Sequence, residues 1–277
     1  MRVSKGMKAF AYFICIMGVL MILFPLYVTI MTAFKTPMES ARSFLTPASS
    51  LYLDNFNSIL EGGDYWPAFF NTVYITALVL LGNLIVMPPL AYAVSRSMDS
   101  NKGYRALYFY LLAGIFIPFQ VRMIPIVKLL SNLSMMSPTG LSILCIGTST
   151  CESVFLYVGY MESIPRDIEE AAYIDGASTA YTFYRVVLPL LKPVIATILI
   201  KEGLWIWNDY MLPLIVLNRS PLDWTLTLFA YNFRSTNDID YGASFACYCL
   251  QMLPILLFYV FMQKHIIGGL TAGAVKS

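Results

Sequence analysis

Six long apolar runs dominate this sequence and restrict what it can fold into. They cover residues 10–34, 71–95, 106–127, 139–161, 194–217 and 243–263. A helix needs roughly 20 apolar residues to cross about 30 Å of hydrocarbon. The runs are too long for barrel strands and lack their strict alternation, so helices are expected. The sequence therefore predicts an all-α, polytopic membrane protein with about six transmembrane helices.

Composition supports a membrane protein and argues against other classes. Of 277 residues, 58% are hydrophobic and only 12% are charged, whereas soluble domains carry about 25% charged residues. A net charge of +2 gives no reason to expect a nucleic-acid partner. The five cysteines lie in apolar runs without zinc-finger or CxxC spacing, and His265 is the single histidine. We therefore expect no metal site.

Lysine and arginine set the expected orientation. The first run is too long for a signal peptide and lacks an Ala-x-Ala site, so it is read as an uncleaved span. With a cytoplasmic N-terminus, the inner segments hold eleven basic residues: Arg2, Lys5, Lys8, Arg96, Lys102, Arg105, Arg166, Arg185, Lys192, Lys264 and Lys276. The outer segments hold five: Lys35, Arg42, Lys128, Arg219 and Arg234. The positive-inside rule then places both termini, residues 1–9 and 268–277, in the cytoplasm.

The segment 162–193 is a polar, helix-forming loop between two apolar runs, on the predicted cytoplasmic side. Ser163-Ile164-Pro165 has the chemistry of a helix start, with Ser163 as the cap and Pro165 in the first turn. Acidic residues follow at 167, 169 and 170, where the helix dipole favours them.

The rest of this loop predicts a turn and a second helix. Gly176 falls where a helix would end on a left-handed residue. Ser178 or Thr179 would cap a helix with an aromatic and aliphatic face, and Pro189 and Pro193 would close it. Read from these residues alone, the helix-turn-helix is either a docking surface for a partner or an amphipathic connector packed on its own bundle.

Several motifs match one family in residue type and spacing. They are Asn71-Thr72-Val73, Ala91-Tyr92-Ala93-Val94-Ser95-Arg96, Ile117-Pro118-Phe119-Gln120, Glu170-Ala171-Ala172 with Asp175-Gly176-Ala177 and Leu188-Pro189, Trp207-Asn208-Asp209-Tyr210, and Gly268-Gly269-Leu270-Thr271. Over nearly its whole length the chain resembles the inner-membrane permease subunits of carbohydrate ABC importers, the maltose-permease-like group of the binding-protein-dependent transport family.

The resemblance implies a larger machine. It would contain this subunit, a second homologous permease subunit, two ATPase subunits and an extracytoplasmic solute-binding protein, in a bacterial-type inner membrane. The chain would form half of the pathway for a sugar or oligosaccharide. Loop 162–193 would couple it to the ATPases, and the tail 268–277 would reach toward them. The implied coupling residues are Glu170, Ala171, Ala172, Asp175, Gly176, Ala177, Leu188 and Pro189.

The chain departs from the family pattern in two places. Lys201-Glu202 replaces a more apolar or aromatic pair ahead of Trp205, and Leu156–Tyr160 lacks a basic residue often found before the Ile-Pro turn. No phosphate-binding Gly-x-x-x-x-Gly-Lys-Ser/Thr loop occurs. We therefore expect ATP on the partner subunits and no cofactor on this chain.

Five charged residues fall inside predicted spans: Arg122, Glu152, Lys201, Glu202 and Asp209. Each would cost about 3 kcal/mol facing lipid, so each should face the bundle or an aqueous path. At 1.5 Å per residue, Glu152 lies roughly 13 Å and Lys201 roughly 10 Å from the inner ends of their spans. The sequence therefore predicts that Glu152 and Lys201 pair between helices.

Asn208 and Asp209 lie further out, among Trp205, Trp207 and Tyr210. Flat apolar faces beside amide and carboxylate groups suit a hydroxyl-rich solute, so these residues are candidates for a cavity wall. The same residues also suit ordinary packing and a helix-end cap.

Other functions receive less support. An intramembrane enzyme would need a nucleophile and base or a metal cluster, and neither a Gly-x-Ser-x-Gly nor a His-Glu-x-x-His motif is present. A secondary transporter would be expected to show internal repeats, and none is evident. An ABC importer for a peptide, amino acid or phosphate remains the closer alternative. The outer segment 35–70 is either a solvated connector with a short helix at Asn55–Leu60 or a surface for an external partner.

Overall fold

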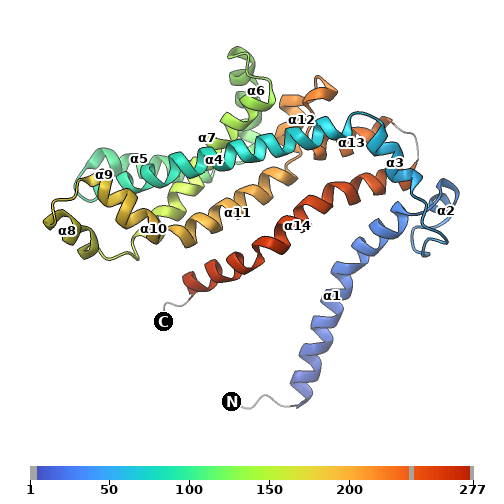
Figure 1. Cartoon of the computed structure of the whole chain (residues 1–277), viewed down its shortest axis with the longest axis horizontal. Coiled ribbons are helices and arrows are strands. Elements are labelled where there is room, and N and C mark those ends of the chain that lie inside the picture. The colour runs from blue at the N-terminus through green and yellow to red at the C-terminus, as the bar shows by residue number, and fades with distance from the viewer. Residues whose placement is uncertain (1–4, 237–239, 275–277) are drawn as a thin grey trace. The chain divides into compact units, whose positions relative to one another are not determined.

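The computed structural model describes the backbone of residues 5–236 and 240–274 and the side chains of residues 6–232 and 240–260 (Figure 1). All regular structure in these residues is helical. The all-α fold is therefore confirmed. The chain divides into two compact units, Met1–Trp66 with Phe229–Pro254, and Pro67–Leu228 with Ile255–Ser277. Three helices, α4, α13 and α14, run from one unit into the other.

The first unit contains α1 (Lys5–Ala33), α2 (Pro37–Arg42) and α3 (Asp54–Glu61), and parts of α4, α13 and α14. Thr36 and Glu39 form a capping box that starts α2. The buried Lys35 ammonium donates to the Ser43 carbonyl at 2.7 Å. The Asn55 amide donates to the carbonyls of Ala33 and Lys35, each at 2.8 Å. The expected short helix is confirmed as α3, and hydrogen bonds from side chains stabilise the fold of this segment.

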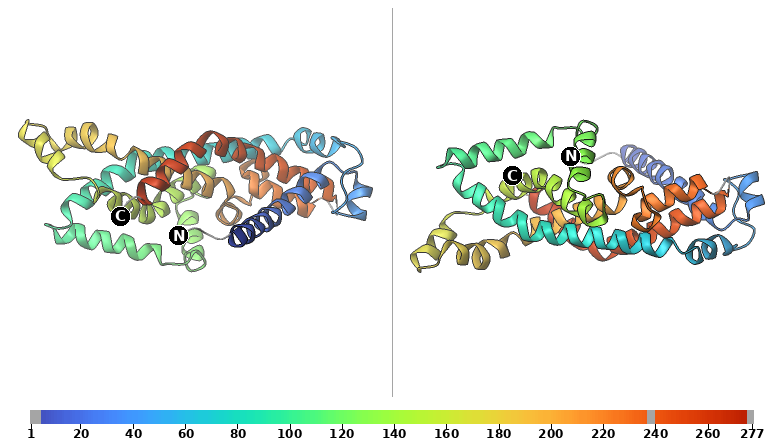
Figure 2. Two further views of the ribbon diagram at one scale, coloured as in Figure 1. Left: turned by 90° about the horizontal axis from the view of Figure 1, so that it is seen from below. Right: turned by 90° about the horizontal axis from the view of Figure 1, so that it is seen from above.

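The second unit carries the rest of the chain. Its elements are α4 (Tyr65–Ser97), α5 (Lys102–Ile115), α6 (Phe119–Asn132), α7 (Pro138–Met161), α8 (Asp167–Ile174), α9 (Thr179–Tyr181), the π-helix η1 (Thr182–Val187), α10 (Leu188–Leu190), α11 (Lys192–Asn208), α12 (Met211–Leu217), the 3₁₀ turn η2 (Pro221–Asp223), and parts of α13 (Leu226–Thr236) and α14 (Tyr241–Ala274). Helix α7 packs against both α5 and α11. Both views in Figure 2 show α8 and α9 as short helices at one end of this unit.

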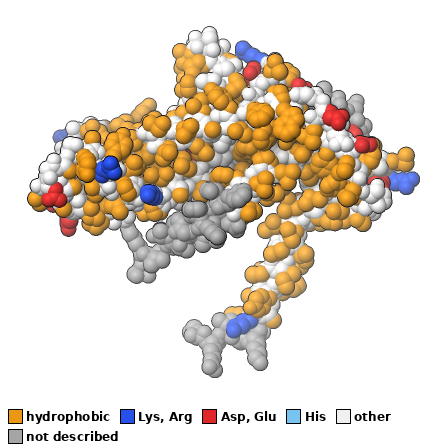
Figure 3. Space-filling view, in the orientation of Figure 1, with side chains coloured by type: hydrophobic (Ala, Val, Ile, Leu, Met, Phe, Trp, Pro, Cys, Tyr) orange, Lys and Arg blue, Asp and Glu red, His pale blue; other side chains and the backbone are white. Residues whose placement is uncertain are grey.

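Membrane-spanning helices match the six predicted runs in number only if bent helices are counted. Within the described residues, four single helices are long and apolar enough to cross: Gly6–Ala33, Tyr65–Ser97, Pro138–Met161 and Tyr241–Val260. Two bent pairs raise the total to six, Lys102–Ile115 with Phe119–Asn132 and Thr179–Leu190 with Lys192–Asn208. In the space-filling view, hydrophobic side chains cover the visible part of α1 and much of the visible face of the second unit (Figure 3).

Two of the predicted runs are not continuous helices. Between α5 and α6 the chain turns by 107°, at Phe116–Pro118. Helix α5 ends at Ile115, and Pro118, with the non-helical values φ −59° and ψ 145°, is the N-cap position of α6. The run 194–217 breaks at Asp209, which is also extended, with φ −69° and ψ 128°. By contrast, α4 stays helical through the Pro88-Pro89 pair.

Two apolar clusters form the core of the second unit. One joins the ends of α4 and α7 to η1, through residues that include Ala91, Val94, Tyr157, Met161, Phe183, Val187 and Leu191. The other joins α6, α7, α12 and the start of α13, through residues that include Ile126, Leu130, Leu141, Leu212, Val216 and Leu228. The first cluster underlies loop 162–193, so this loop rests on the packed ends of two spanning helices.

The predicted C-terminal tail falls mostly outside the described side chains. The backbone continues helix α14 as far as Ala274. Residues 275–277, the side chains of 261–277 and residues 1–4 of the N-terminal segment lie outside what the structure describes.

Candidate functional site

Helix α8 has acidic residues in its first turn and a left-handed glycine after its last turn. Asp167, Glu169 and Glu170 occupy its first turn, where negative charge interacts favourably with the helix dipole. At its end, Gly176 has φ +83°. The Gly176 N–H donates to the Tyr173 carbonyl at 3.0 Å, and the Ala177 N–H donates to the Ala172 carbonyl at 2.9 Å. These two bonds define a Schellman motif. The predicted left-handed glycine is therefore confirmed.

The predicted cap at the start of α8 is wrong. The Ser163 hydroxyl donates to the Tyr160 carbonyl at 2.6 Å, so it belongs to the last turn of α7. Helix α8 begins at Asp167, its N-cap position is Arg166, and no side chain caps it. Pro165 consequently precedes the cap instead of occupying the first turn. Ser163 lies one helical turn after Tyr160, where its hydroxyl reaches the carbonyl three residues back.

The second helix of the loop is also different from the expectation. Ser178 caps α9 by accepting from the Tyr181 N–H at 3.3 Å, as predicted. The chain then widens into η1, where the Leu188 N–H donates to the Phe183 carbonyl five residues back. Pro189 follows directly. Because proline has no N–H and crowds the carbonyl four residues before it, an ordinary α-helical turn is unfavourable here.

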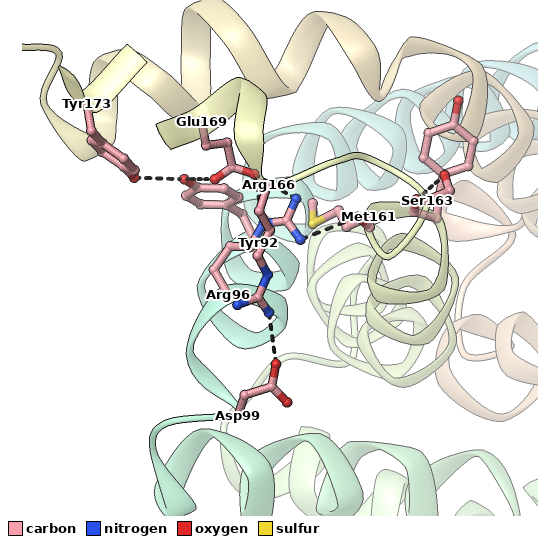
Figure 4. Close-up of polar contacts among 9 residues, drawn as sticks. Tyr92, Arg96, Asp99, Met161, Ser163, Arg166, Glu169 and Tyr173 are labelled. Carbon is pink, nitrogen blue, oxygen red and sulfur yellow. Dashed lines mark hydrogen bonds and ion pairs between the residues drawn. The ribbon is translucent and has the colours of Figure 1, made fainter. Parts of the chain in front are cut away.

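Glu169 holds α8 on the end of α4. The Glu169 side chain is only 7% exposed and that of Arg96 is 15% exposed. Arg96 donates to one Glu169 oxygen through Nε at 2.8 Å, and its Nη2 lies 2.6 Å from the same oxygen as an ion pair. The Tyr92 hydroxyl donates to the other oxygen at 2.8 Å. Both carboxylate oxygens are therefore occupied. Figure 4 shows Glu169 between Tyr92 and Arg96.

Two further contacts extend this attachment. The Tyr92 and Tyr173 hydroxyls lie 3.3 Å apart, and because Tyr92 already donates to Glu169, Tyr173 is the donor between them. Arg166 and Asp99 pair at 2.8 Å, but their side chains are 53% and 65% exposed. An exposed pair contributes about 0–1 kcal/mol, so the buried Glu169 contact dominates the attachment.

The opposite face of α8 is open to solvent. Glu170, Ala171 and Asp175 are exposed, and Ile174 is 85% exposed. Tyr181 and Tyr184 are large exposed side chains on the following segment. Such a group of uncovered apolar residues on a membrane protein's polar loop is typical of an interaction surface.

The eight predicted coupling residues therefore divide into two groups. Glu170, Ala171, Asp175 and Gly176 are exposed, as is Pro189. Ala172 and Ala177 are half-buried and form the Schellman turn, while Leu188 packs against the first apolar cluster. The first group lies on the open face, and the second group packs beneath it or forms the turn that ends α8.

Three of the five charged residues in the predicted spans form one ionic group. The Lys201 ammonium lies 2.5 Å from Glu152 and 3.3 Å from Glu202. The predicted contact between Glu152 and Lys201 is thus present, and Glu202, whose side chain is 5% exposed, joins it. Each of these side chains has an opposite charge close by, which lowers the cost of placing it at membrane depth.

Arg122 and Asp209 do not belong to that group. They line a cavity of about 320 Å³ together with Trp205. Asn208 is not part of this lining, because its amide donates to the Leu204 carbonyl on its own helix at 2.7 Å. Arg122 and Asp209 therefore line a cavity, whereas the Asn208 side chain bonds to its own helix.

Sequence reasoning missed the partner residues Tyr92 and Arg96. The sequence places Tyr92 and Arg96 in a family motif and Arg96 among the basic residues, and Glu169 among the first-turn acids, but it does not predict a contact between them. The available signal was an acid next to Glu170 in the first turn of the predicted loop helix, with a basic residue at the C-terminal end of the predicted second span. A helix that shows one face to solvent must anchor the other, which favours this pairing.

Comparison with known proteins gives a consistent family. A family model described as "Binding-protein-dependent transport system inner membrane component" matches residues 87–271. The multiple sugar-binding transport system permease protein MsmG of Streptococcus mutans is 40% identical over 269 residues, covering 96% of each chain. The probable starch degradation products transport system permease protein AmyC of Thermoanaerobacterium thermosulfurigenes is 32% identical, covering 96% of this chain and 97% of the relative.

Solved structures agree on the fold. A crystal structure of a bacterial ABC transporter involved in the import of the acidic polysaccharide alginate contains a chain that matches with a TM-score of 0.81. The two chains are 22% identical, and the match covers 95% of this chain and 99% of the other. The resemblance first drawn from the motifs is confirmed, and the chain belongs to the family of binding-protein-dependent transport system inner membrane components.

Proposed function

We propose that this chain is the permease subunit of an ATP-driven, binding-protein-dependent importer, that it forms half of the pathway for a sugar or oligosaccharide, and that loop 162–193 couples it to ATPase subunits. The observation that carries the coupling role is the two-sided construction of α8. Glu169 anchors one face to α4, while Glu170, Ala171 and Ile174 remain exposed on the other. A coupling helix must be rigidly attached to the spanning helices and must leave a surface exposed for the ATPase subunit to bind.

The packing beneath the loop supports transmission of motion. Phe183 and Val187 of η1 are buried against residues of α4 and α7, and the rings of Tyr92 and Phe183 lie 5.0 Å apart. Close-packed interiors resist compression, so a displacement of α8 moves the ends of spanning helices instead of being absorbed locally.

The proposed assembly contains partners that this chain needs. The sequence has no phosphate-binding loop, so ATP would bind two separate ATPase subunits and this chain would hold no cofactor. A second homologous permease subunit would complete the pathway, and an extracytoplasmic solute-binding protein would deliver cargo. In this arrangement residues 1–9, loop 162–193 and the tail 268–277 are cytoplasmic, in accordance with the excess of basic residues on that side.

A carbohydrate cargo is supported by the relatives. The names of MsmG and AmyC refer to sugar and to starch degradation products. A peptide or amino-acid cargo, or secondary transport, is the alternative that the experiment must separate.

The test is uptake by proteoliposomes that contain the complete complex. We expect ATP-dependent accumulation of a radiolabelled oligosaccharide in the presence of the binding protein, and none without ATP. Glu170→Lys and Gly176→Arg should insert normally and reduce uptake to background, whereas Lys102→Gln, at the exposed start of α5, should retain it. Normal uptake by both loop variants would remove the coupling role. Uptake without ATP would indicate a secondary transporter, and transport of peptides alone would overturn the carbohydrate cargo.

A further inference from the structure

Two interrupted helices meet at one cavity in the second unit. Phe119, Arg122 and Ile126 come from the start of α6, directly after the 107° turn. Asp209 is the extended residue between α11 and α12. Trp205 of α11 and Thr148 of α7 complete the polar and aromatic part of the wall.

Hydrogen bonds within the protein stabilise the interruption at Asp209. The Thr227 hydroxyl donates to the Asp209 carbonyl at 2.7 Å, which satisfies an acceptor that the helix break leaves free. One carboxylate oxygen of Asp209 accepts from the backbone N–H groups of Met211 at 3.0 Å and Leu212 at 3.4 Å. Irregular backbone at membrane depth persists only where protein buries it or where it lines a cavity. Interrupted spans in membrane transporters mark binding sites for this reason.

The cavity holds charge that the protein leaves unused. The Arg122 Nε is buried and has no hydrogen-bond partner among the described residues. Asp209 lines the same cavity, but no ion pair joins the two within 4.0 Å. A guanidinium carries five N–H donors and a carboxylate has about four acceptor positions. Leaving the Arg122 Nε unpaired at membrane depth is costly, and Asp209 has acceptor positions beyond its two backbone bonds, so a ligand with both donors and acceptors would stabilise the two groups.

We propose that this cavity binds one ring of a neutral sugar on its way through the pathway. The ring lies with its apolar face against Trp205, Arg122 donates to ring and hydroxyl oxygens, and the free oxygen of Asp209 accepts from a hydroxyl group. The proposal rests on the function proposed above and assigns this chain a direct share in recognising the cargo.

The chemistry of the wall selects a neutral ring over other ligands. Hydroxyl groups both donate and accept, so a sugar can satisfy Arg122 and Asp209 together. A uronate ring would pair with Arg122 but place its carboxylate in the same cavity as Asp209, where like charges repel. A volume of about 320 Å³ is at the lower end of ligand cavities, which suits a single ring better than a whole oligosaccharide.

The test separates this site from the general function. Binding is measured by equilibrium dialysis of the purified complete complex, without binding protein, against radiolabelled maltotriose, raffinose and tri-galacturonate. Uptake of each sugar is measured separately in proteoliposomes, in the presence of the binding protein. We expect the wild type to bind and transport a neutral trisaccharide and to bind tri-galacturonate at least about tenfold more weakly.

Variants of the cavity should change affinity without changing assembly. Arg122→Gln and Asp209→Asn should each weaken neutral-sugar binding about tenfold or more, since each removes a charge-assisted hydrogen bond. Trp205→Ala should do the same, and Trp205→Tyr, which keeps an aromatic face, should recover most of the affinity. Lys128→Gln, on the exposed side of α6, is the matched control and should bind like the wild type.

Each outcome decides one claim. If the wild type transports a neutral sugar and the three cavity variants bind it with unchanged affinity, the site is wrong while the importer function stands. Stronger binding of tri-galacturonate would also overturn the site's assignment to neutral sugars. Absence of uptake for all three sugars would overturn the proposed cargo and this proposal with it. If the Arg122 or Asp209 variant fails to assemble, the comparison of Trp205→Ala with the conservative Trp205→Tyr decides whether the cavity binds the sugar.

Discussion

Removing the Glu169 carboxylate should detach α8 from the bundle while leaving the rest of the protein folded. Glu169→Gln keeps the size of the side chain but leaves Arg96, which is only 15% exposed, without its negative partner. Breaking a buried ion pair by removing one member costs about 3–5 kcal/mol. Helix α8 has eight residues, and this pair with the Tyr92 bond is its main polar attachment. The loss should therefore appear as local opening of α8.

The magnitude can be measured as hydrogen exchange of the amides in 167–177 on the purified complex. A loss of about 3 kcal/mol corresponds to a roughly 100-fold increase in exchange, since each 1.4 kcal/mol is a factor of ten. The matched control is Asp99→Asn, which breaks the exposed pair with Arg166, and its effect should stay within about 1 kcal/mol. Adding Arg96→Gln to Glu169→Gln should recover part of the loss, because no uncompensated buried charge remains.

Exchange in α4 and α7 serves as the internal reference and should not change. Uptake should fall in parallel with the opening of α8, because a loosely attached handle cannot move the spans. If Glu169→Gln and Asp99→Asn raise exchange in α8 equally, or if neither does, the argument that the buried pair anchors the loop is refuted.

Three further outcomes follow from the same structure. Reversing the charge of either Glu152 or Lys201 should impair assembly by about 3 kcal/mol. Swapping the two residues should restore assembly in part, because the Glu placed at position 201 would then adjoin Glu202. If the double variant yields no more assembled complex than the single variants, the contact is unimportant. Gly176→Ala should destabilise the folded loop by about 1–2 kcal/mol through its left-handed φ alone, because no atom lies within 4 Å of the added Cβ. Faster hydrogen exchange in α8 would reveal this loss, and unchanged exchange would contradict the Schellman assignment. Gly140→Ala should lower the unfolding temperature, because its Cβ would clash with the Met135 carbonyl, whereas Gly147→Ala on the same helix meets open space and should not; equal unfolding temperatures would count against the packing at the start of α7.

Features that depend on local chemistry could be predicted from the sequence. Apolar run length gave the spanning helices, and Gly176 gave the left-handed turn, because its conformation depends on the residue itself. The contact between Glu152 and Lys201 followed from depth, since two opposite charges at similar depth in a bundle must find each other or water.

Features that depend on tertiary contacts could not be predicted from the sequence. The break at Asp209 follows a run that reads as continuous, and its stability comes from Thr227, a residue 18 positions away. The Ser163 hydroxyl has an alternative acceptor in Tyr160, which its sequence pattern does not distinguish from a cap. The anchor of α8 joins Glu169 to Arg96 across 73 positions, and only the folded chain brings them together.

The central claim is that α8 is a cytoplasmic handle gripped by a separate ATPase. It is tested most directly by placing a cysteine at the highly exposed Ile174, in a chain whose own exposed Cys15 is replaced by serine, and mapping its contacts in the assembled complex against the same chain without the added cysteine. The account predicts that Ile174→Cys crosslinks to the ATPase subunit and reacts with a membrane-impermeant thiol reagent only from the cytoplasmic side. Labelling from the outside, or crosslinking to the solute-binding protein instead, would contradict it.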